Sequence, residues 1–263
     1  MTDTFLNEIE KIKAEAKKSY RNIMKIIPSN ISTIKNKHQI DLNRIEMDRL
    51  WLENYAEKVI LVLKEFTGES VAENLQDGLR KKYVHLEVLV KKVYNSDWNY
   101  LDNLAKKTGV EKEELYFLGL ELGKPVYELY AEVLKDKLDL DNWGKGFCPV
   151  CGSPAALSYL RKEDGKRILW CQFCETQWSF MRLKCPFCSN EDQKSLRYFF
   201  TEEKDFYRVD VCDKCKSYIK TIDQRKMPHP NELSLYRESM QTLFLDLLAE
   251  RDGYSSLSVQ KRV

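Results

Sequence analysis

Residue types that mark enzyme active sites are scarce in this chain. Only three histidines occur in 263 residues, and His38, His85 and His229 are too scattered to form a metal-ligand or catalytic set. The sequence also has no phosphate-binding loop, no dinucleotide fingerprint and no serine–histidine–carboxylate arrangement. These absences argue against the enzyme classes that such motifs mark.

Long apolar runs are absent as well. The N-terminal sequence MTDTFLNEIEK has no signal-peptide core, and the chain is nowhere apolar for long enough to cross a membrane. We therefore expect a cytoplasmic protein without membrane insertion. Its 43 basic and 41 acidic residues nearly balance, so charge gives no bulk attraction to nucleic acid or anionic lipid. With 43% hydrophobic and 32% charged residues, the composition is that of a folded soluble protein.

Cysteine is missing from residues 1–140, where apolar residues instead recur at spacings of three and four. This periodicity predicts a bundle of α-helices. The first apolar stripe ends before Pro28, and the second ends at Gly68, a favoured residue after a helix. The stripes consist of Phe5, Ile9, Ile12, Ala16, Tyr20, Ile23 and Ile27, and of Trp51, Tyr55, Val59, Val62 and Phe66.

Two breaks divide the rest of this helical part. Gly109 is one, and Gly123-Lys124-Pro125 is the other, with Pro125 well placed in the first turn of a new helix. Further helices are predicted over 84–95, 98–107, 112–122 and 125–137.

The chain changes character at about residue 141. Cys-x-x-Cys pairs alternate there with short runs that are typical of strands. After Pro228 and Pro230 the sequence predicts one more helix, which Gly253 closes and which we expect to pack back on another part of the protein. The predicted strands are 156–160, 167–170, 196–200 and 207–211, and the apolar face of the last helix comprises Leu233, Tyr236, Met240, Leu243 and Leu247.

Eight cysteines form four Cys-x-x-Cys pairs in this second half. Because the cytosol keeps thiols reduced, this spacing indicates metal binding or redox chemistry and not disulfides. One Cys-x-x-Cys turn points two thiolates at one ion, and two such turns make a tetrahedral four-sulfur site. The pairs are Cys148 with Cys151, Cys171 with Cys174, Cys185 with Cys188, and Cys212 with Cys215.

The order of the pairs shows an internal duplication. In each half the first pair reads Cys-Pro-x-Cys and the second lacks the proline. Arg167 and Arg208 each stand four residues before a second pair, and Trp178 and Tyr218 follow it. Since sequential closure is favoured by loop entropy, we expect one ion at Cys148, Cys151, Cys171 and Cys174, and another at Cys185, Cys188, Cys212 and Cys215.

The ions are either iron or zinc, because four thiolates in a tetrahedron suit both. A loop-rich segment of about 70 residues has a thin core, and a structural zinc ion contributes roughly 10–16 kcal/mol of apparent binding free energy. The metals are therefore expected to stabilise the fold, while a closed four-cysteine site leaves no position for a substrate.

Gly152 follows the first Cys-x-x-Cys turn, or knuckle, where a positive φ helps backbone amides reach the sulfurs. Ser189 takes that place in the second site.

These patterns predict an α+β fold with four parts. A helical domain covers 1–140, a first four-cysteine module 141–182 and a second 183–226, and a C-terminal helix and tail cover 227–263. The gap of 19 residues between Cys151 and Cys171 suits a zinc-ribbon hairpin. The gap of 23 residues between Cys188 and Cys212 is somewhat longer, and a larger loop absorbs the difference.

Two other readings of the cysteine segment remain open. A nucleic-acid zinc ribbon needs clustered positive charge, but residues 141–222 carry 14 Lys/Arg against 11 Asp/Glu. Two divalent ions in four-thiolate sites would bring that segment to about −1, which disfavours phosphate binding. Thiol redox catalysis is the second reading, because Cys-x-x-Cys also serves in redox enzymes. Four pairs at ribbon spacing favour ligands instead.

Several strings of this half form a set: Gly146–Ser153, Leu169–Glu175 with Trp178, Arg182–Cys188, Cys212–Asp223, and Leu243–Ala249 with Gly253 and Tyr254. Together they resemble the FdhE family of formate dehydrogenase accessory proteins, over about residues 146–254. Over residues 1–140 the only likeness to the family is that this part is predicted to be helical.

The resemblance implies a cytoplasmic factor, and not an enzyme, that is needed to make active respiratory formate dehydrogenase. Members of the family bind the catalytic subunit, a molybdenum or tungsten pterin enzyme, during maturation and before export. A helical N-terminal domain and two rubredoxin-like metal modules are implied, with the eight cysteines as ligands. The expected partner is therefore this catalytic subunit. The alternative is a zinc-ribbon protein with another partner, either a different molybdopterin oxidoreductase or a nucleic acid.

Two departures from the family pattern bear on the partner. The last helix has Glu238-Ser239 where two adjacent acidic residues are expected, and the tail ends Ser-Val-Gln-Lys-Arg-Val instead of an apolar, proline-containing sequence. If either feature contacts the client, recognition by this chain differs.

Overall fold

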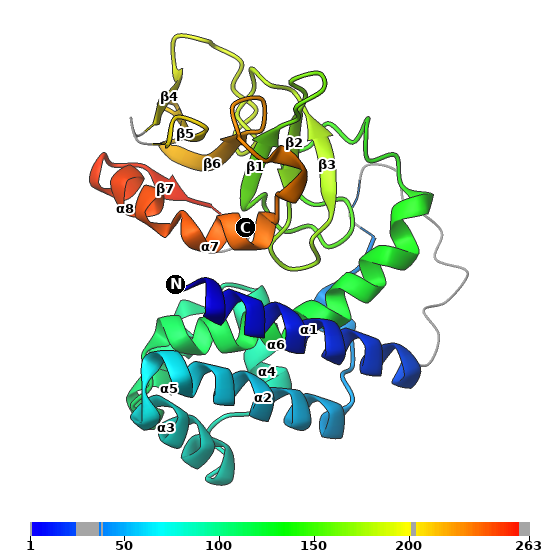
Figure 1. Cartoon of the computed structure of the whole chain (residues 1–263), viewed down its shortest axis with the longest axis vertical. Helices are drawn as coiled ribbons and strands as arrows, with labels where there is room; N and C mark the ends of the chain where they lie inside the picture. Colours follow the sequence, from blue (N-terminus) through cyan, green and yellow to red (C-terminus); the bar gives the residue numbers. More distant parts are fainter. Residues whose placement is uncertain (1, 25–36, 38, 201–203, 258–263) are drawn as a thin grey trace. The chain divides into compact units, whose positions relative to one another are not determined.

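The computed structural model describes residues 2–24, 37, 39–200 and 204–257. The described chain forms two compact units (Figure 1): unit 1 holds residues 2–24 and 41–133, and unit 2 holds residues 37, 39–40 and 134–257. The α+β fold predicted from the sequence is confirmed. His38, the predicted helix end at Pro28 and the C-terminal tail from residue 258 lie outside the described residues.

Unit 1 is the predicted helical bundle. Apolar stripes drive its assembly, and acidic N-caps fix the helix starts: Asp48 accepts a hydrogen bond from the amide of Trp51 at 2.8 Å. Gly68 caps the second helix with φ of 102°, as the sequence predicts. The unit comprises α1 (Asp3–Ile23), the short helix η1 (Leu42–Arg44), α2 (Arg49–Thr67), α3 (Glu69–Arg80), α4 (Leu86–Tyr94), α5 (Trp98–Thr108) and most of α6 (Lys112–Leu134).

Helix α3 has no counterpart among the predicted helices. Its buried residues are only Ala72, Leu75 and Gly78, so its apolar stripe is thinner than that of its neighbours. The helix forms because it packs on α2 and α5, and such tertiary contacts override a weak local pattern.

The predicted break at Gly123-Lys124-Pro125 is wrong, because α6 runs through it without interruption. Proline in a helix removes one backbone hydrogen bond, at a cost of about 3 kcal/mol. Burial offsets this cost, since Leu122 and Val126 on either side are completely buried. Gly123 serves close packing here: a Cβ at this position would lie 2.9 Å from Cγ1 of Val90 on α4.

Unit 2 is built on one sheet with the strand order β3-β2-β1-β6-β5-β4, and β7 pairs with β6. Two antiparallel hairpin systems, one from each predicted cysteine module, join where β1 runs parallel to β6. The predicted strands are present, while β3, β6 and β7 were not predicted. The strands are β1 (Leu157–Leu160), β2 (Arg167–Trp170), β3 (Gln177–Phe180), β4 (Leu196–Phe200), β5 (Tyr207–Cys212), β6 (Ser217–Asp223) and β7 (Ser255–Ser256), and η2 (Lys135–Lys137) precedes them.

The C-terminal segment packs on this sheet, as expected, but as two helices where one was predicted. These are α7 (Leu235–Gln241) and α8 (Leu243–Arg251), which follow η4 (Pro230–Glu232). The chain turns at Thr242, and this turn changes which side of α8 faces the sheet. Leu245 and Ala249 are buried, whereas Leu243 and Leu247, predicted to face the core, are 46% and 69% exposed.

Helices α7 and α8 lie beside the sheet of unit 2 (Figure 1), and polar contacts fix them there. The Tyr207 hydroxyl of β5 donates to Glu238 of α7. Lys220 of β6 forms a 2.7 Å ion pair with Asp246 of α8, and the Lys220 side chain is buried. The described helices include none that is both long enough and apolar enough to span a membrane.

Candidate metal centre

The first cluster gathers Cys148 and Cys151, which precede β1, with Cys171 and Cys174, which follow β2. All four side chains are buried, and their sulfur atoms lie within 4.8 Å of one another. The Cys148 and Cys174 sulfurs are 3.5 Å apart, as are those of Cys151 and Cys171. The structure thus brings together the first set of four cysteines that the sequence grouped.

The second cluster gathers the other predicted set within the same 4.8 Å limit. Cys185 and Cys188 precede β4, Cys212 is the last residue of β5, and Cys215 lies in the turn to β6. The sulfurs of Cys185 and Cys215 are 3.7 Å apart, and so are those of Cys188 and Cys212. Neither His85 nor His229 belongs to a cluster.

The sulfur spacing distinguishes ligands from disulfides. A disulfide bond is about 2.05 Å long, and all eight cysteines are free thiols. Metal–sulfur bonds of about 2.3 Å in a tetrahedron place the sulfurs about 3.8 Å apart. The observed separations of 3.5 to 3.7 Å are close to that value. Each cluster therefore has the donor set and the dimensions for one tetrahedral ion.

All four knuckles share one backbone conformation. The residue after the second cysteine has a positive φ in each: 77° at Gly152, 55° at Glu175, 58° at Ser189 and 55° at Lys216. Its amide donates to the carbonyl of the first cysteine at 2.8 to 3.0 Å. The positive φ predicted at Gly152 is confirmed, and the other three positions adopt the same turn without glycine, so composition alone does not reveal it.

Polar side chains two residues after a knuckle lie beside the sulfurs. Ser153 and Thr176 place their hydroxyl oxygens 3.1 Å from the sulfurs of Cys151 and Cys174. In the second cluster, the side-chain amide of Asn190 donates to the Cys212 sulfur at 3.7 Å. Sequence reasoning missed these residues, although their shared position after each knuckle was a readable signal.

The two clusters differ in exposure. In the first all four cysteines are buried, whereas Cys188 and Cys215 of the second are partly exposed. Burial raises the pKa of the Cys148 thiol well above its ordinary value. For Cys212, burial raises the pKa, but hydrogen bonds from the amides of Cys215 and Lys214 act in the opposite direction, and the net shift is downward. Burial also raises the pKa of Cys185 and of Cys188 in the second cluster, so we expect that cluster to react faster because reagents reach the partly exposed Cys188 and Cys215.

This difference predicts two phases of thiol release. When the protein is treated with a chelator and a thiol-reactive disulfide reagent, we expect four thiols to react at least about tenfold faster than the other four. Peptide mapping after partial reaction should find the label on Cys188 and Cys215 first. Equal rates at all eight cysteines would contradict the burial argument.

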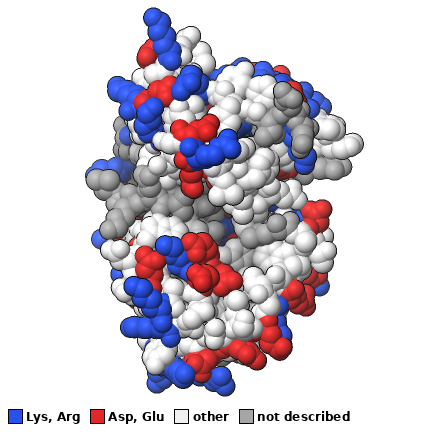
Figure 2. Space-filling model, turned by 90° about the vertical axis from the view of Figure 1, so that its left-hand side faces the viewer, with Lys and Arg blue, Asp and Glu red and all other residues white. Residues whose placement is uncertain are grey.

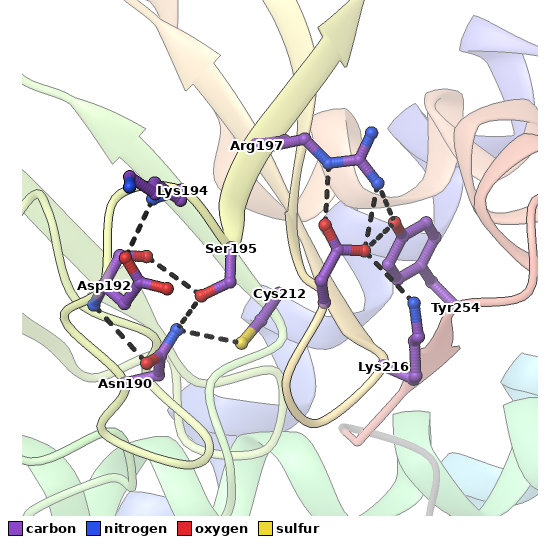
Figure 3. Close-up of polar contacts among 9 residues, drawn as sticks. Asn190, Asp192, Lys194, Ser195, Arg197, Cys212, Lys216 and Tyr254 are labelled. Atoms are coloured by element: carbon purple, nitrogen blue, oxygen red, sulfur yellow. Dashed lines mark hydrogen bonds and ion pairs between the residues drawn. The ribbon is translucent and has the colours of Figure 1, made fainter.

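Polar contacts connect the second cluster to Tyr254, which follows α8 and Gly253 (Figure 3). Asp213, between Cys212 and Cys215, pairs with Arg197 of β4 at 2.8 Å and with Lys216 at 3.1 Å. The Tyr254 hydroxyl donates to the same carboxylate at 2.7 Å. On the other side of the cluster, Asn190 contacts both Ser195 and Cys212 (Figure 3). These contacts explain why the tyrosine after the last helix belongs to the same sequence pattern as the knuckles.

The duplicated arginines meet at one carboxylate. Arg167 of β2 and Arg208 of β5 both contact Asp210, at 3.1 and 3.0 Å. Thr221 donates to Asp210 at 2.6 Å. Of the duplicated aromatics, Trp178 is buried and donates from its indole nitrogen to the carbonyl of Lys145 at 2.8 Å.

Gly146 lies against the second cluster from the first module. A Cβ on this residue would be 1.6 Å from the carbonyl oxygen of Pro186, which stands between Cys185 and Cys188. Gly146→Ala must push the two backbones apart, so we expect a loss of about 1–3 kcal/mol in the free energy of unfolding. Urea denaturation measures this loss. Lys162→Ala, in an exposed turn, is the control, and an equal stability for both variants would refute the close approach.

The charge on the molecular surface is mixed. On the face drawn in Figure 2, Lys and Arg side chains are interspersed with Asp and Glu in each unit. This face offers no broad surface of one sign of the kind that binds a nucleic-acid backbone.

Comparison with known proteins identifies relatives of both cysteine modules. The family model "FdhE, central domain" matches residues 147–182, and "FdhE, C-terminal domain" matches residues 183–261. A protein named FdhE homolog from Aquifex aeolicus is 32% identical over 190 residues, which cover 70% of this chain and 63% of that protein. The chain thus matches less than two thirds of the length of this relative.

Two further matches cover more of the chain. Protein FdhE of Escherichia coli is 25% identical over 235 residues, which are 87% of this chain and 70% of that protein. The crystal structure of the FdhE protein from Pseudomonas aeruginosa matches with a TM-score of 0.65 and 19% identity, over 94% of this chain and 84% of that one. This structural likeness shows a shared fold, including the helical part.

Proposed function

Because the chain belongs to the FdhE family, we propose that it is an accessory protein that binds the catalytic subunit of respiratory formate dehydrogenase during maturation in the cytoplasm. Family membership supports the accessory role, and the two clusters support a role in binding. In this proposal the protein performs no turnover of its own.

The eight cysteines are proposed to hold two metal ions, one per cluster. The residues fit such ions, since each cluster offers four thiols within 4.8 Å on knuckles of the same backbone geometry. A bound iron or zinc ion would cross-link the two knuckles of its cluster and so stabilise a module whose own apolar core is thin. The modules are proposed to span residues 141–182 and 183–226.

The observation that carries this proposal is the closed character of both clusters. Four sulfurs complete a tetrahedron, so a loaded site has no position for a substrate or an activating water. What the loaded modules offer is a rigid surface. The knuckles fix the turn after β5. Through Asp213 they also fix the start of β4, at Arg197, and Tyr254.

Glu238, the acidic residue of the Glu238-Ser239 pair that departs from the family pattern, has a structural role inside unit 2. Glu238 accepts the hydrogen bond from Tyr207, which ties α7 to β5. Its carboxylate is therefore already engaged by the fold. The change from two acidic residues to Glu238-Ser239 leaves open a client other than formate dehydrogenase, such as another molybdopterin oxidoreductase.

Direct binding tests the proposal. The metal-loaded protein is titrated into the purified catalytic subunit of formate dehydrogenase from the same organism. Calorimetry and size-exclusion chromatography measure the formation of a complex. We expect a stable complex with a micromolar or lower Kd. If no complex forms, while mixed oligonucleotides bind with an affinity that falls steeply with salt, the protein is a nucleic-acid zinc ribbon instead.

A further inference from the structure

Strand β4 is an open edge of the sheet in unit 2. The opposite edge, β3, is covered, because the Ser179 amide donates to the carbonyl of Leu140 at 2.9 Å. No strand in the described part of the chain pairs with the outer side of β4. An open edge presents unpaired N–H and C=O groups that can accept another strand.

The open edge carries aromatic side chains. Tyr198 and Phe200 are 57% and 48% exposed, and their two rings lie 6.3 Å apart in a stacked arrangement. Soluble proteins usually protect open edges with charged residues or proline. An exposed aromatic edge is instead a feature of surfaces that bind a partner.

The face of the sheet that bears these rings also bears arginines. The strand register aligns Phe200 with Arg208, and Tyr198 with Asp210. The guanidinium carbon of Arg208 lies 4.8 Å from the centre of the Tyr198 ring, so this cation leans toward the open edge. Arg167 reaches the same place from β2 and is completely buried, with Asp210 as its acidic partner.

Tyr198, Arg167, Arg208 and Asp210 line a cavity of about 140 Å³ that Arg182 also borders. Asp210 is the one carboxylate in its lining, and it is shared by Arg167 and Arg208. No described carboxylate pairs with Arg182. Lys184 and Arg197, also in the lining, are neutralised from outside by Glu191 and Asp213. Arg167 and Arg208 share one carboxylate, and Arg182 is an exposed cation without an acidic partner in the described chain, which suits it to meet a carboxylate from another molecule.

The second cluster borders this cavity through Cys185 and Cys212. Cys212 and Arg208 are four residues apart on β5, which is about 13 Å along an extended strand. A loaded cluster of four thiolates and a divalent ion carries about −2 and offsets positive charge near Cys185, whereas Arg208 is the cation that contacts Tyr198 at the open edge. The segment from Arg182 to Phe187 borders the cavity and contains Cys185, so loss of the ion alters the wall of the cavity.

We propose that β4 and this arginine cavity are the docking site for an extended segment of the partner that carries an acidic side chain. The segment adds to the edge of β4 through backbone hydrogen bonds, its apolar side chains pack on Tyr198 and Phe200, and its carboxylate meets Arg208 and Arg182. This assignment rests on the proposed function, since the partner it describes is the catalytic subunit. It gives the second cluster a specific task, which is to hold one wall of the docking site.

Hydrogen–deuterium exchange tests the assignment on the full metal-loaded chain, alone and with the purified catalytic subunit of formate dehydrogenase. We expect the amides of residues 196–200 to exchange more slowly in the complex. Arg182→Gln and Tyr198→Ser both alter exposed side chains, so both variants should fold, and each should weaken binding about tenfold. Arg251→Gln removes the same charge from an exposed position that does not line the cavity, and should bind normally.

The outcomes separate the two proposals. A complex of normal affinity, with unchanged exchange at β4 and with both variants binding like the unchanged protein, would overturn the docking site and leave the accessory function standing. Absence of any complex with the unchanged protein would overturn the accessory function and this assignment together. Loss of binding in Arg251→Gln equal to that in Arg182→Gln would show a general charge effect, and the docking site would again be rejected.

Discussion

The variant Cys212→Ser is expected to carry one metal ion per chain instead of two and to lose client binding. Serine is a poor ligand for a soft-metal site, and Cys212 also accepts a hydrogen bond from Asn190. A structural site of this kind contributes roughly 10–16 kcal/mol of apparent binding free energy, so residues 183–226 should unfold when the ion is lost. Cys185→Ser should behave in the same way.

Elemental analysis and limited proteolysis of the variant measure both effects. The matched control is Lys214→Ser, which introduces the same residue at an exposed position of the same knuckle. It should keep two ions and normal binding. A Cys212→Ser protein that has lost its ion, remains folded and still binds the catalytic subunit would refute the view that the metal holds the binding surface.

Asp210→Ala is expected to destabilise unit 2 by about 3–5 kcal/mol, because it leaves buried cations without their partner. The Asp210 carboxylate accepts from Arg167, Arg208 and Thr221. Burial already lowers the pKa of Arg167, although Asp210 opposes that shift. With the carboxylate gone, the Arg167 side chain remains completely buried without its acidic partner.

Urea unfolding of the metal-loaded variant measures the loss. Asp164→Ala is the control: this aspartate also binds an arginine, Arg161, with two hydrogen bonds, but in an exposed turn. Exposed pairs contribute little, so the control should be close to the unchanged protein. If Asp164→Ala and Asp210→Ala are equally stable, the buried contacts of Asp210 make no special contribution to the free energy of unfolding.

The cysteine sites could be predicted from the sequence because their signal is local and regular. Ligand spacing identified both sets of four, and loop entropy favoured the sequential grouping that the structure shows. The positive φ at Ser189 and Lys216 could not be predicted in this way, since neither residue favours it. The conformation accompanies the backbone hydrogen bond that closes each knuckle, and only at Gly152 does the residue type indicate it.

Tertiary contacts account for the predictions that were wrong. Gly123 and Pro125 carry the local pattern of a helix break, yet packing against Val90 keeps α6 continuous. After residue 233 the error has the opposite sign: a regular apolar stripe predicted one continuous helix, but a turn at Thr242 divides the segment into α7 and α8. Leu247 is exposed as a result. Long-range pairing likewise created the parallel contact of β1 with β6, which joins two modules that the sequence shows as separate repeats.

The arginine network illustrates what a sequence reveals in part. The sequence shows that Arg167 and Arg208 occupy equivalent positions in the two repeats. It does not show which residue they contact or what these contacts do. Folding places both side chains on Asp210, next to the open strand β4. The meaning of such residues depends on strand register, which local patterns in a short, loop-rich segment do not determine.

The metal content of the protein purified without oxygen tests the central claim most directly. Elemental analysis, with an optical spectrum of the same sample, should give two ions per folded chain. Rubredoxin-like charge-transfer bands would identify iron, and a featureless visible spectrum would identify zinc. A folded, fully reduced protein with less than one ion per chain would contradict the account, because the eight thiols would then be neither ligands nor supports for a binding surface.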